Sequence, residues 1–219
     1  MLSLALGLAS YVAAGATLGL WFAGVLLATL VTPPLVLAHV SLARRAFAGG
    51  AVVDGIGLIW LVAAFRSETS LGEWLACYLV LAAHAFALAT LAMLLCRIGV
   101  NVMVASALAV VVGLLWLTWP VWLAPYLSGD SGAAVVGWLA PAHPLIAING
   151  VLQHLGVWGE QRLAYHLTNL GQDVPYEFPP TILPAMLAHV IVGAAFGYLS
   201  TTPPRGKRHA PAPPAGSLQ

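Results

Sequence analysis

The sequence predicts an all-α, polytopic helical membrane protein with about six transmembrane helices, five being possible. Hydrophobic residues make up 61% of the 219 residues and charged residues only 7%, whereas about 25% charged residues is usual for soluble domains. The apolar runs are long and do not alternate with a period of two, so they indicate helices rather than the strands of a membrane barrel. The net charge of +1 gives no support to nucleic-acid binding.

The transmembrane domain is expected to cover residues 1–200. Crossing a bilayer core of about 30 Å takes about 20 helical residues, and residues 2–42 carry no charge. This first run suits two spans with a tight turn near Gly15–Gly19. One long span that ends at Pro33–Pro34, followed by an interfacial helix, is the alternative. The predicted spans are residues 3–18, 20–42, 48–65, 74–96, 102–124 and 178–199, with an outer cap at 125–177.

Basic residues gather on one predicted side of the membrane. Six of the eight Lys and Arg residues fall there: Arg44, Arg45, Arg97, Arg205, Lys207 and Arg208. Arg66 and Arg162 fall on the opposite side, with every acidic residue except Asp54. The positive-inside rule makes the basic side cytoplasmic. We therefore expect a multi-pass protein of the cell (inner) membrane, whose Pro-rich, basic and disordered tail, residues 201–219, is cytoplasmic.

The segment WLAPAHPLIAING, residues 138–150, is apolar but carries Pro141, His143 and Pro144. The two prolines interrupt a helical hydrogen-bond ladder, and Asn149–Gly150 is expected to supply a turn. Such a segment fits a re-entrant or interfacial hairpin on the outer side, since non-helical backbone at that depth must be covered by protein or line a wet cavity. An ordinary extracellular loop with an amphipathic helix is the alternative.

Three histidines, His39, His84 and His189, fall inside predicted spans. Ionisable residues within a membrane are candidates for function, but the preferred interpretation is a neutral histidine bonded to a neighbouring carbonyl or hydroxyl across a helix interface. Imidazole is also an axial ligand of haem, and the small residues beside these histidines leave room for a flat macrocycle. Asp54 could be a proton or ion site, although capping of a helix N-terminus is favoured.

The sequence contains no recognisable catalytic motif. A Gly-rich phosphate loop, an HExxH motif and a nucleophile elbow are all missing, so the chain is not expected to be an enzyme or to hydrolyse ATP. His143, His154 and His166 follow one another at spacings of 11 and 12 residues. They share no helical face, and no metal site is predicted.

The order of segments from residue 88 onward resembles a known family. LATLAMLLCRIGVNVMVASALAVVVGLLWLTWPVW contains a small-residue span, an Arg-containing turn and a second span that ends in aromatics and proline; LAPAHPLIAING and a final span follow. This order resembles the C-terminal half of type-2 ABC exporter permeases. TPPLVLAHVSLARRAFAGG is similar to the end of that family's second span and its cytoplasmic entry. The resemblance covers about residues 30–200.

The resemblance implies an integral membrane permease subunit of an ATP-driven transport complex, which forms part of a translocation path. The implied partners are a separate ATPase subunit, which Arg44 and Arg45 could contact, and a second permease copy or paralogue. Polar groups in apolar segments are costly to leave facing lipid. On that ground four residues are candidates for lining the path: His84, Asn101, His143 and Asn149.

An alternative function belongs to another class, a subunit of a membrane energy-conversion complex that is either structural or binds haem or chlorophyll. His39, His84 or His189 would then be the cofactor ligands. No cofactor is expected if the chain is a permease.

Overall fold

The computed structural model describes residues 17–123, 126, 129–155 and 179–202. Within these ranges the chain is helical and contains no strand, which confirms the predicted fold class. The elements are α2 (Thr17–Leu37), α3 (Leu42–Ala64), α4 (Leu71–Arg97), α5 (Val102–Trp122), α6 (Gly129–Leu139), η2 (Ala140–Ala142), α7 (Pro144–Val151), η3 (Gln153–Leu155) and α10 (Leu183–Thr201). Residues 3–16 of the predicted span at 3–18, residues 156–178 of the outer cap and residues 203–219 of the tail lie outside the described residues. Gly19 lies inside α2, so the turn predicted near Gly15–Gly19 does not extend to it.

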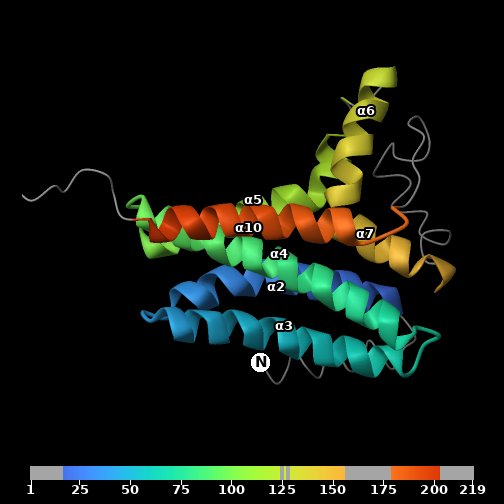
Figure 1. The fold of residues 1–219 in the computed structure, drawn as a ribbon, viewed down its shortest axis with the longest axis horizontal. Coiled ribbons are helices and arrows are strands. Elements are labelled where there is room, and N and C mark those ends of the chain that lie inside the picture. The colour runs from blue at the N-terminus through green and yellow to red at the C-terminus, as the bar shows by residue number, and fades with distance from the viewer. Residues whose placement is uncertain (1–16, 124–125, 127–128, 156–178, 203–219) are drawn as a thin grey trace, which may run out of the picture.

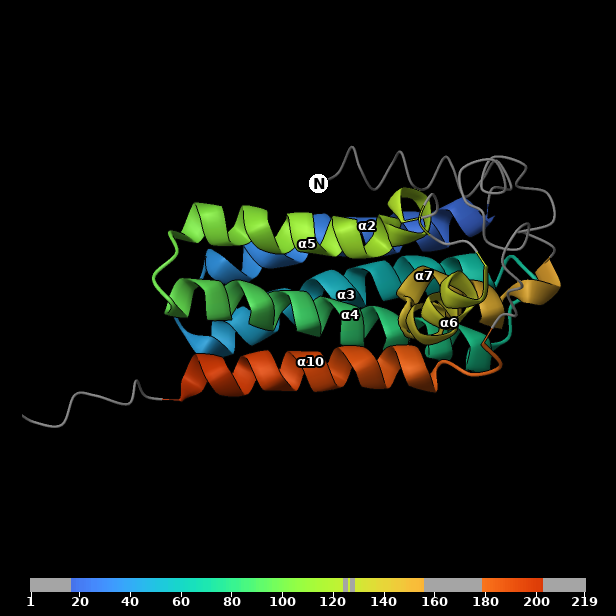
Figure 2. The same ribbon diagram turned by 90° about the horizontal axis from the view of Figure 1, so that it is seen from above.

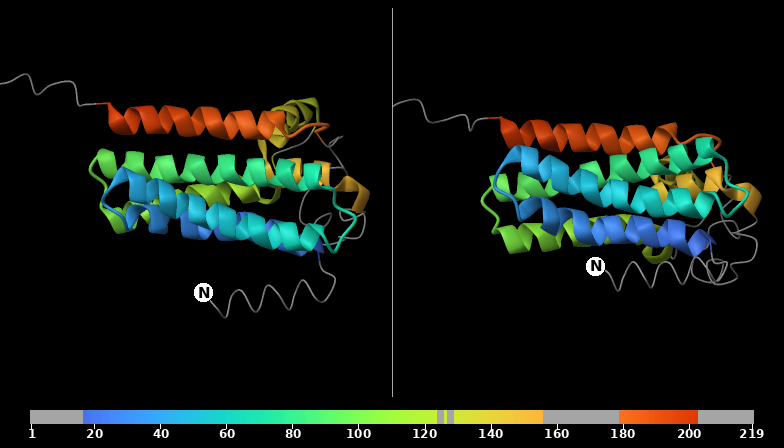
Figure 3. Two further views of the ribbon diagram at one scale, coloured as in Figure 1. Left: turned by 60° about the horizontal axis from the view of Figure 1, so that its bottom comes forward. Right: turned by 90° about the horizontal axis from the view of Figure 1, so that it is seen from below.

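Five helices are long and apolar enough to cross a membrane: α2 from Gly19 onward, α3, α4, α5 and α10. They lie side by side in one elongated bundle, which Figures 1 and 2 show from two directions and Figure 3 from two more. The helices before and after the break at His143 are bent by 74° relative to each other, so they count as either a broken sixth span or a re-entrant loop. The protein is therefore a polytopic helical membrane protein.

The bundle has two distinct ends. At the end that we call the Arg97 end lie the turn between α2 and α3, the turn between α4 and α5, and the last turn of α10, where Arg97 Nη2 donates a hydrogen bond to Thr202 O at 2.7 Å. At the other end, the α7 end, α7 lies beside the start of α4 and the start of α10 (Figure 1).

The start of α3 differs from the prediction. Ser41 caps the helix, its Oγ accepting a hydrogen bond from Arg44 N at 3.3 Å, so α3 begins at Leu42 rather than at about residue 48. The prediction that Asp54 caps a helix is wrong, because a serine already satisfies the N-terminal amide and Asp54 lies well inside α3.

The proline pair does not end α2 directly. The helix continues through Pro33 and Pro34 and ends at Leu37. Both prolines fall among the last five residues, where Ala38 N still bonds to Pro34 O at 3.0 Å. The two prolines lack the N–H groups that would bond to the carbonyls of Thr29 and Leu30, so two bonds of the ladder are lost just before the helix ends.

Side chains also define the two ends of α4. Ser70 and Glu73 form a reciprocal capping box at its start, with Ser70 N donating to Glu73 Oε2 at 2.7 Å. At its end Gly99 adopts φ +97°, the left-handed conformation that glycine tolerates. Asn101 then caps α5, its Oδ1 accepting a hydrogen bond from Met103 N at 2.9 Å. Asn101 therefore lies exposed at the Arg97 end.

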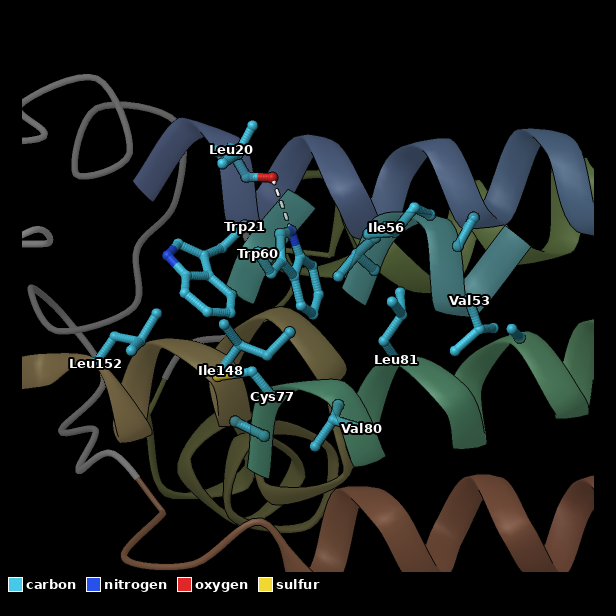
Figure 4. Packing of buried hydrophobic residues seen from close by; sticks show 14 of the residues in the cluster. Leu20, Trp21, Val53, Ile56, Trp60, Cys77, Val80, Leu81, Ile148 and Leu152 are labelled. Atoms are coloured by element: carbon cyan, nitrogen blue, oxygen red, sulfur yellow. Dashed lines mark hydrogen bonds between the residues drawn. The ribbon is translucent and has the colours of Figure 1, made fainter. Parts of the chain in front are cut away.

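The largest apolar cluster fills the α7 end of the bundle (Figure 4). Trp21 of α2 and Trp60 of α3 are fully buried with ring centroids 4.8 Å apart, and Trp60 Nε1 donates to Leu20 O at 3.2 Å. Ile148 and Leu152, in and just after α7, are buried in the same cluster. Although α7 spans only eight residues, it is part of the core and not a surface loop.

Helix α10 packs along α4 because a glycine allows close approach. A Cβ at Gly193 would lie 2.5 Å from Phe86 Cδ1 and 3.2 Å from Ala87 Cα, too close for a methyl group. Close packing through small residues is the usual way that membrane helices associate, since lipid supplies little hydrophobic drive between them. This contact places His189 of α10 beside the middle of α4.

Candidate functional site: a buried histidine cluster

Three histidines from separate elements meet inside the bundle. His84 is the central residue of α4, with thirteen helical residues on either side; His189 belongs to α10, and His143 occupies the break before α7. Their exposed fractions are only 1%, 7% and 1%. The rings of His84 and His189 meet edge to face with centroids 5.0 Å apart. Trp116 joins the third ring to them, since its centroid lies 5.8 Å from that of His143 and 6.2 Å from that of His189.

The hydrogen bonds of His84 determine its tautomer. His84 Nε2 lies 2.9 Å from Thr29 Oγ1, which itself lies 2.8 Å from Val25 O. The hydroxyl has one proton, and the carbonyl can only accept it, so His84 Nε2–H is the donor to Thr29. In the neutral ring Nδ1 is then a bare lone pair. It is buried and has no hydrogen-bond partner.

His189 also has one nitrogen that can accept a hydrogen bond. Its Nδ1 lies 2.8 Å from Ala185 O, one turn earlier on the same helix. A carbonyl only accepts, so Nδ1 carries the hydrogen and Nε2 carries the lone pair of the neutral ring. His84 and His189 thus each keep one nitrogen lone pair that the described hydrogen bonds leave unused. This is the chemical feature of the site, a pair of acceptors inside an apolar bundle.

His143 has a different, structural role. Its Nδ1 accepts a hydrogen bond from Ile146 N at 3.3 Å, and its Nε2 lies 3.2 Å from Leu117 O, to which it donates. Both ring nitrogens are therefore satisfied. His143 caps α7 and ties the break to α5, while Pro141 and Pro144 occupy first-turn positions of η2 and α7 that tolerate proline.

The prolines therefore start helices and do not open a hairpin turn. The predicted turn at Asn149–Gly150 is wrong, because both residues lie inside α7 and the chain bends before it, at His143. The broader prediction of a re-entrant segment is one of the two arrangements that the bent helix pair allows, the other being a broken span.

Several buried polar atoms around this site lack a hydrogen-bond partner: His84 Nδ1, Trp116 Nε1, Trp119 Nε1, and both amide atoms of Asn149. Such atoms are rare in native interiors.

Clustered Trp near a helix end is typical of a membrane interface. Here, however, Trp119 is only 2% exposed, and its ring lies 5.9 Å from that of His143.

A cavity of about 320 Å³ adjoins the histidine pair between α4, α5, α10 and η2. His84, His189 and Trp116 line it together with aliphatic side chains and the small residues Ala87 and Gly113. Its size is within the range of small-molecule sites, which are mostly apolar with a few placed polar groups. We call this space the histidine cavity.

The structure separates the predicted site residues into groups. His84 and His143 lie in the cluster, and Asn149 is buried on α7. Asn101 lies at the Arg97 end and not with the other three, because it caps α5. Thr29 is a site residue that the sequence did not single out. The sequence indicated Trp116 and Trp119 as part of a membrane-interface belt and not of this site.

The other candidates lie elsewhere. His39 follows α2 at the Arg97 end, away from His84 and His189, and its carbonyl accepts a hydrogen bond from Arg45 Nε at 2.7 Å. His154 Nδ1 lies 3.4 Å from Glu73 Oε1, and His166 lies outside the described residues. Among the residues whose structure is described, no three His, Cys, Asp or Glu side chains gather to hold a metal ion.

Comparisons with protein families, with curated proteins and with solved structures find no match. The fold and the site therefore define the class: a polytopic helical membrane protein with a buried histidine cluster.

Proposed function

We propose that the chain is the permease subunit of an ATP-driven transport complex similar to type-2 ABC exporters. A second permease copy or paralogue and a separate ATPase complete the complex. The path between the two permease subunits is exposed alternately to either side of the membrane, and the ATPase drives the change. The Arg97 end faces the cytoplasm, and exposed Arg44 meets the ATPase there.

The observation that carries the proposal is the position of the bent helix pair α6–α7 in the chain. The pair lies between the last two long helices, and this is the order of segments that the resemblance implies. Helix α4, a turn with Arg97, helix α5, the bent pair and helix α10 follow one another. The pair places α7 in the core, and Ala142 of η2, between α6 and α7, lines the histidine cavity. Polar groups kept at that depth are expected to face a path and not lipid.

Purification tests the proposal directly. The full chain, tagged and extracted from its own membrane, is expected to bring one ATPase subunit with it and to hydrolyse ATP in that complex. A photo-crosslinking residue in place of Arg44 should join the two chains, whereas one in place of Glu68, at the other end of the bundle, should not. Crosslinking from position 68 alone would contradict the orientation, and ATPase-free preparations would contradict the function.

The haem or chlorophyll hypothesis remains an untested alternative. His84 and His189 each offer the lone pair that an axial ligand needs, yet their rings touch each other edge to face at 5.0 Å and do not flank a gap between them. His39 lies at the far end of the bundle. A Soret or chlorophyll band in the visible spectrum of the purified protein would favour this alternative over transport.

A further inference from the structure

A second cavity of about 370 Å³ lies between α2, α3 and α4. It shares no lining residue with the histidine cavity. Most of its wall is apolar and includes Val53, Phe86 and Met93. We call it the Asp54 cavity after the acidic residue that lines it.

Asp54 lies close to the middle of a helix long enough to cross the membrane. Twelve residues of α3 precede it and ten follow it. Its side chain is exposed, and Tyr78 donates a hydrogen bond to Oδ1 at 2.6 Å. No described cation forms an ion pair with it. A carboxylate at that depth is costly unless it is neutralised, which makes it a functional candidate.

Three further polar residues line the Asp54 cavity: Thr32, Arg45 and Thr90, whose Oγ1 donates to Phe86 O at 2.9 Å. Thr32 is fully buried and its Oγ1 has no hydrogen-bond partner. Arg45 lies toward the Arg97 end and donates to His39 O. Nine residues separate Arg45 from Asp54 on α3, a rise of about 13.5 Å along the helix, so this guanidinium does not neutralise the carboxylate.

We propose that the Asp54 cavity binds a lipophilic monovalent cation, an apolar organic molecule that carries one ammonium group. Asp54 is the counter-ion, and Tyr78 holds its carboxylate in place. Thr32 Oγ1 accepts a hydrogen bond from the ammonium group, and the apolar wall covers the hydrocarbon part. A mostly apolar pocket with one unpaired carboxylate and few polar groups is a suitable site for such a molecule, and Arg45, the other charged lining residue, lies at the opposite end of the cavity along α3. The site does not depend on the proposed transport function.

Calorimetry on the full-length protein in detergent tests the site with 4-phenylbutylammonium as the probe. Pentylbenzene is the matched neutral probe, because a methyl group replaces the ammonium group at similar size. The wild-type protein should bind the cation saturably at one site. Asp54→Asn should weaken that binding at least tenfold and leave pentylbenzene binding unchanged, whereas Asp54→Glu should retain most of the affinity. Thr32→Val should weaken it by a smaller factor.

Glu68→Gln is the matched control, since it removes an exposed loop carboxylate of the same charge and should bind like the wild type. Thermal unfolding of every variant checks that it is folded. The proposal is overturned if the wild-type protein shows no saturable binding of the cation. It is also overturned if folded Asp54→Asn binds the cation as tightly as the wild type, or if Glu68→Gln weakens binding equally.

Discussion

His84 and His189 meet edge to face with ring centroids 5.0 Å apart, although 105 residues separate them in the chain. Each ring gives one N–H to an acceptor, Thr29 Oγ1 for His84 and Ala185 O for His189. Each keeps its second nitrogen as a possible acceptor. Each ring is therefore in one defined tautomer. The contribution of each hydrogen bond to the stability of the protein can then be measured by substituting its partner.

Thr29→Val is expected to destabilise the protein by about 1–3 kcal/mol, because it leaves His84 Nε2–H buried without an acceptor. The free energy of unfolding in detergent, followed by circular dichroism, measures the effect. Thr118→Val is the control. Thr118 makes a similar bond to Leu114 O but is exposed. Thr118→Val should therefore change the free energy of unfolding by no more than about 0.5 kcal/mol. Equal effects of the two substitutions would contradict the stabilising role of the buried His84–Thr29 hydrogen bond.

His143→Ala is expected to lower stability by about 0.5–2 kcal/mol through loss of the α7 cap, with a further loss from the bond to Leu117 O. His143→Asn should recover the capping part, since Asn is a favoured N-cap residue, but not the bond to α5. The same unfolding measurement ranks wild type, Asn and Ala in that order. If Asn and Ala proved equally unstable, the capping role would be refuted.

Gly193→Ala should separate α10 from α4, because the added Cβ would lie 2.5 Å from Phe86 Cδ1. Overpacking of this kind typically lowers stability by about 1–3 kcal/mol. Gly55→Ala is the matched control in α3, where a Cβ meets no atom within 4 Å. That change should be neutral or stabilising by up to about 1 kcal/mol, since alanine has the higher helix propensity.

Single introduced cysteines test the orientation of the bundle. The background replaces the native thiols, buried Cys77 and partly buried Cys96. Cysteines in place of Arg44 and Arg97 should react with a membrane-impermeant maleimide from the cytoplasmic side only. A cysteine in place of Glu68 should react only from the opposite side. Labelling of positions 44 and 97 from different sides would refute the shared end.

The spans could be predicted from composition because length and hydrophobicity alone determine which segments fit a bilayer. The partner of His84 could not. The α2 and α4 segments are apolar all round, so no amphipathic stripe indicates which face of either helix is turned inward. Thr29 lies 55 residues from His84, and only the packed bundle shows that they touch.

Asn101 illustrates the opposite case, in which a local signal was present. Asn101 lies beside an apolar run and His84 inside one, and the cost of burying a polar group does not by itself separate their roles. Asn101, however, directly precedes a long apolar run, as N-cap residues do. The bend at His143 was also partly predictable from a local signal, the proline that follows it. Pro144 marked the discontinuity, but its fixed φ also suits the first position of a helix, and the structure uses it that way.

Helix α6 points away from the bundle (Figure 1), while its last turns rest on α5 through Val136 and Trp119. The same indole lies 5.9 Å from His143, whose two ring nitrogens hold α7 and α5 together. Helix α6 therefore joins the domain through an apolar cluster that also includes Ala140 and Ile146. A displacement of α6 would therefore be transmitted to His143, α5 and α7 through this cluster and the two hydrogen bonds of His143.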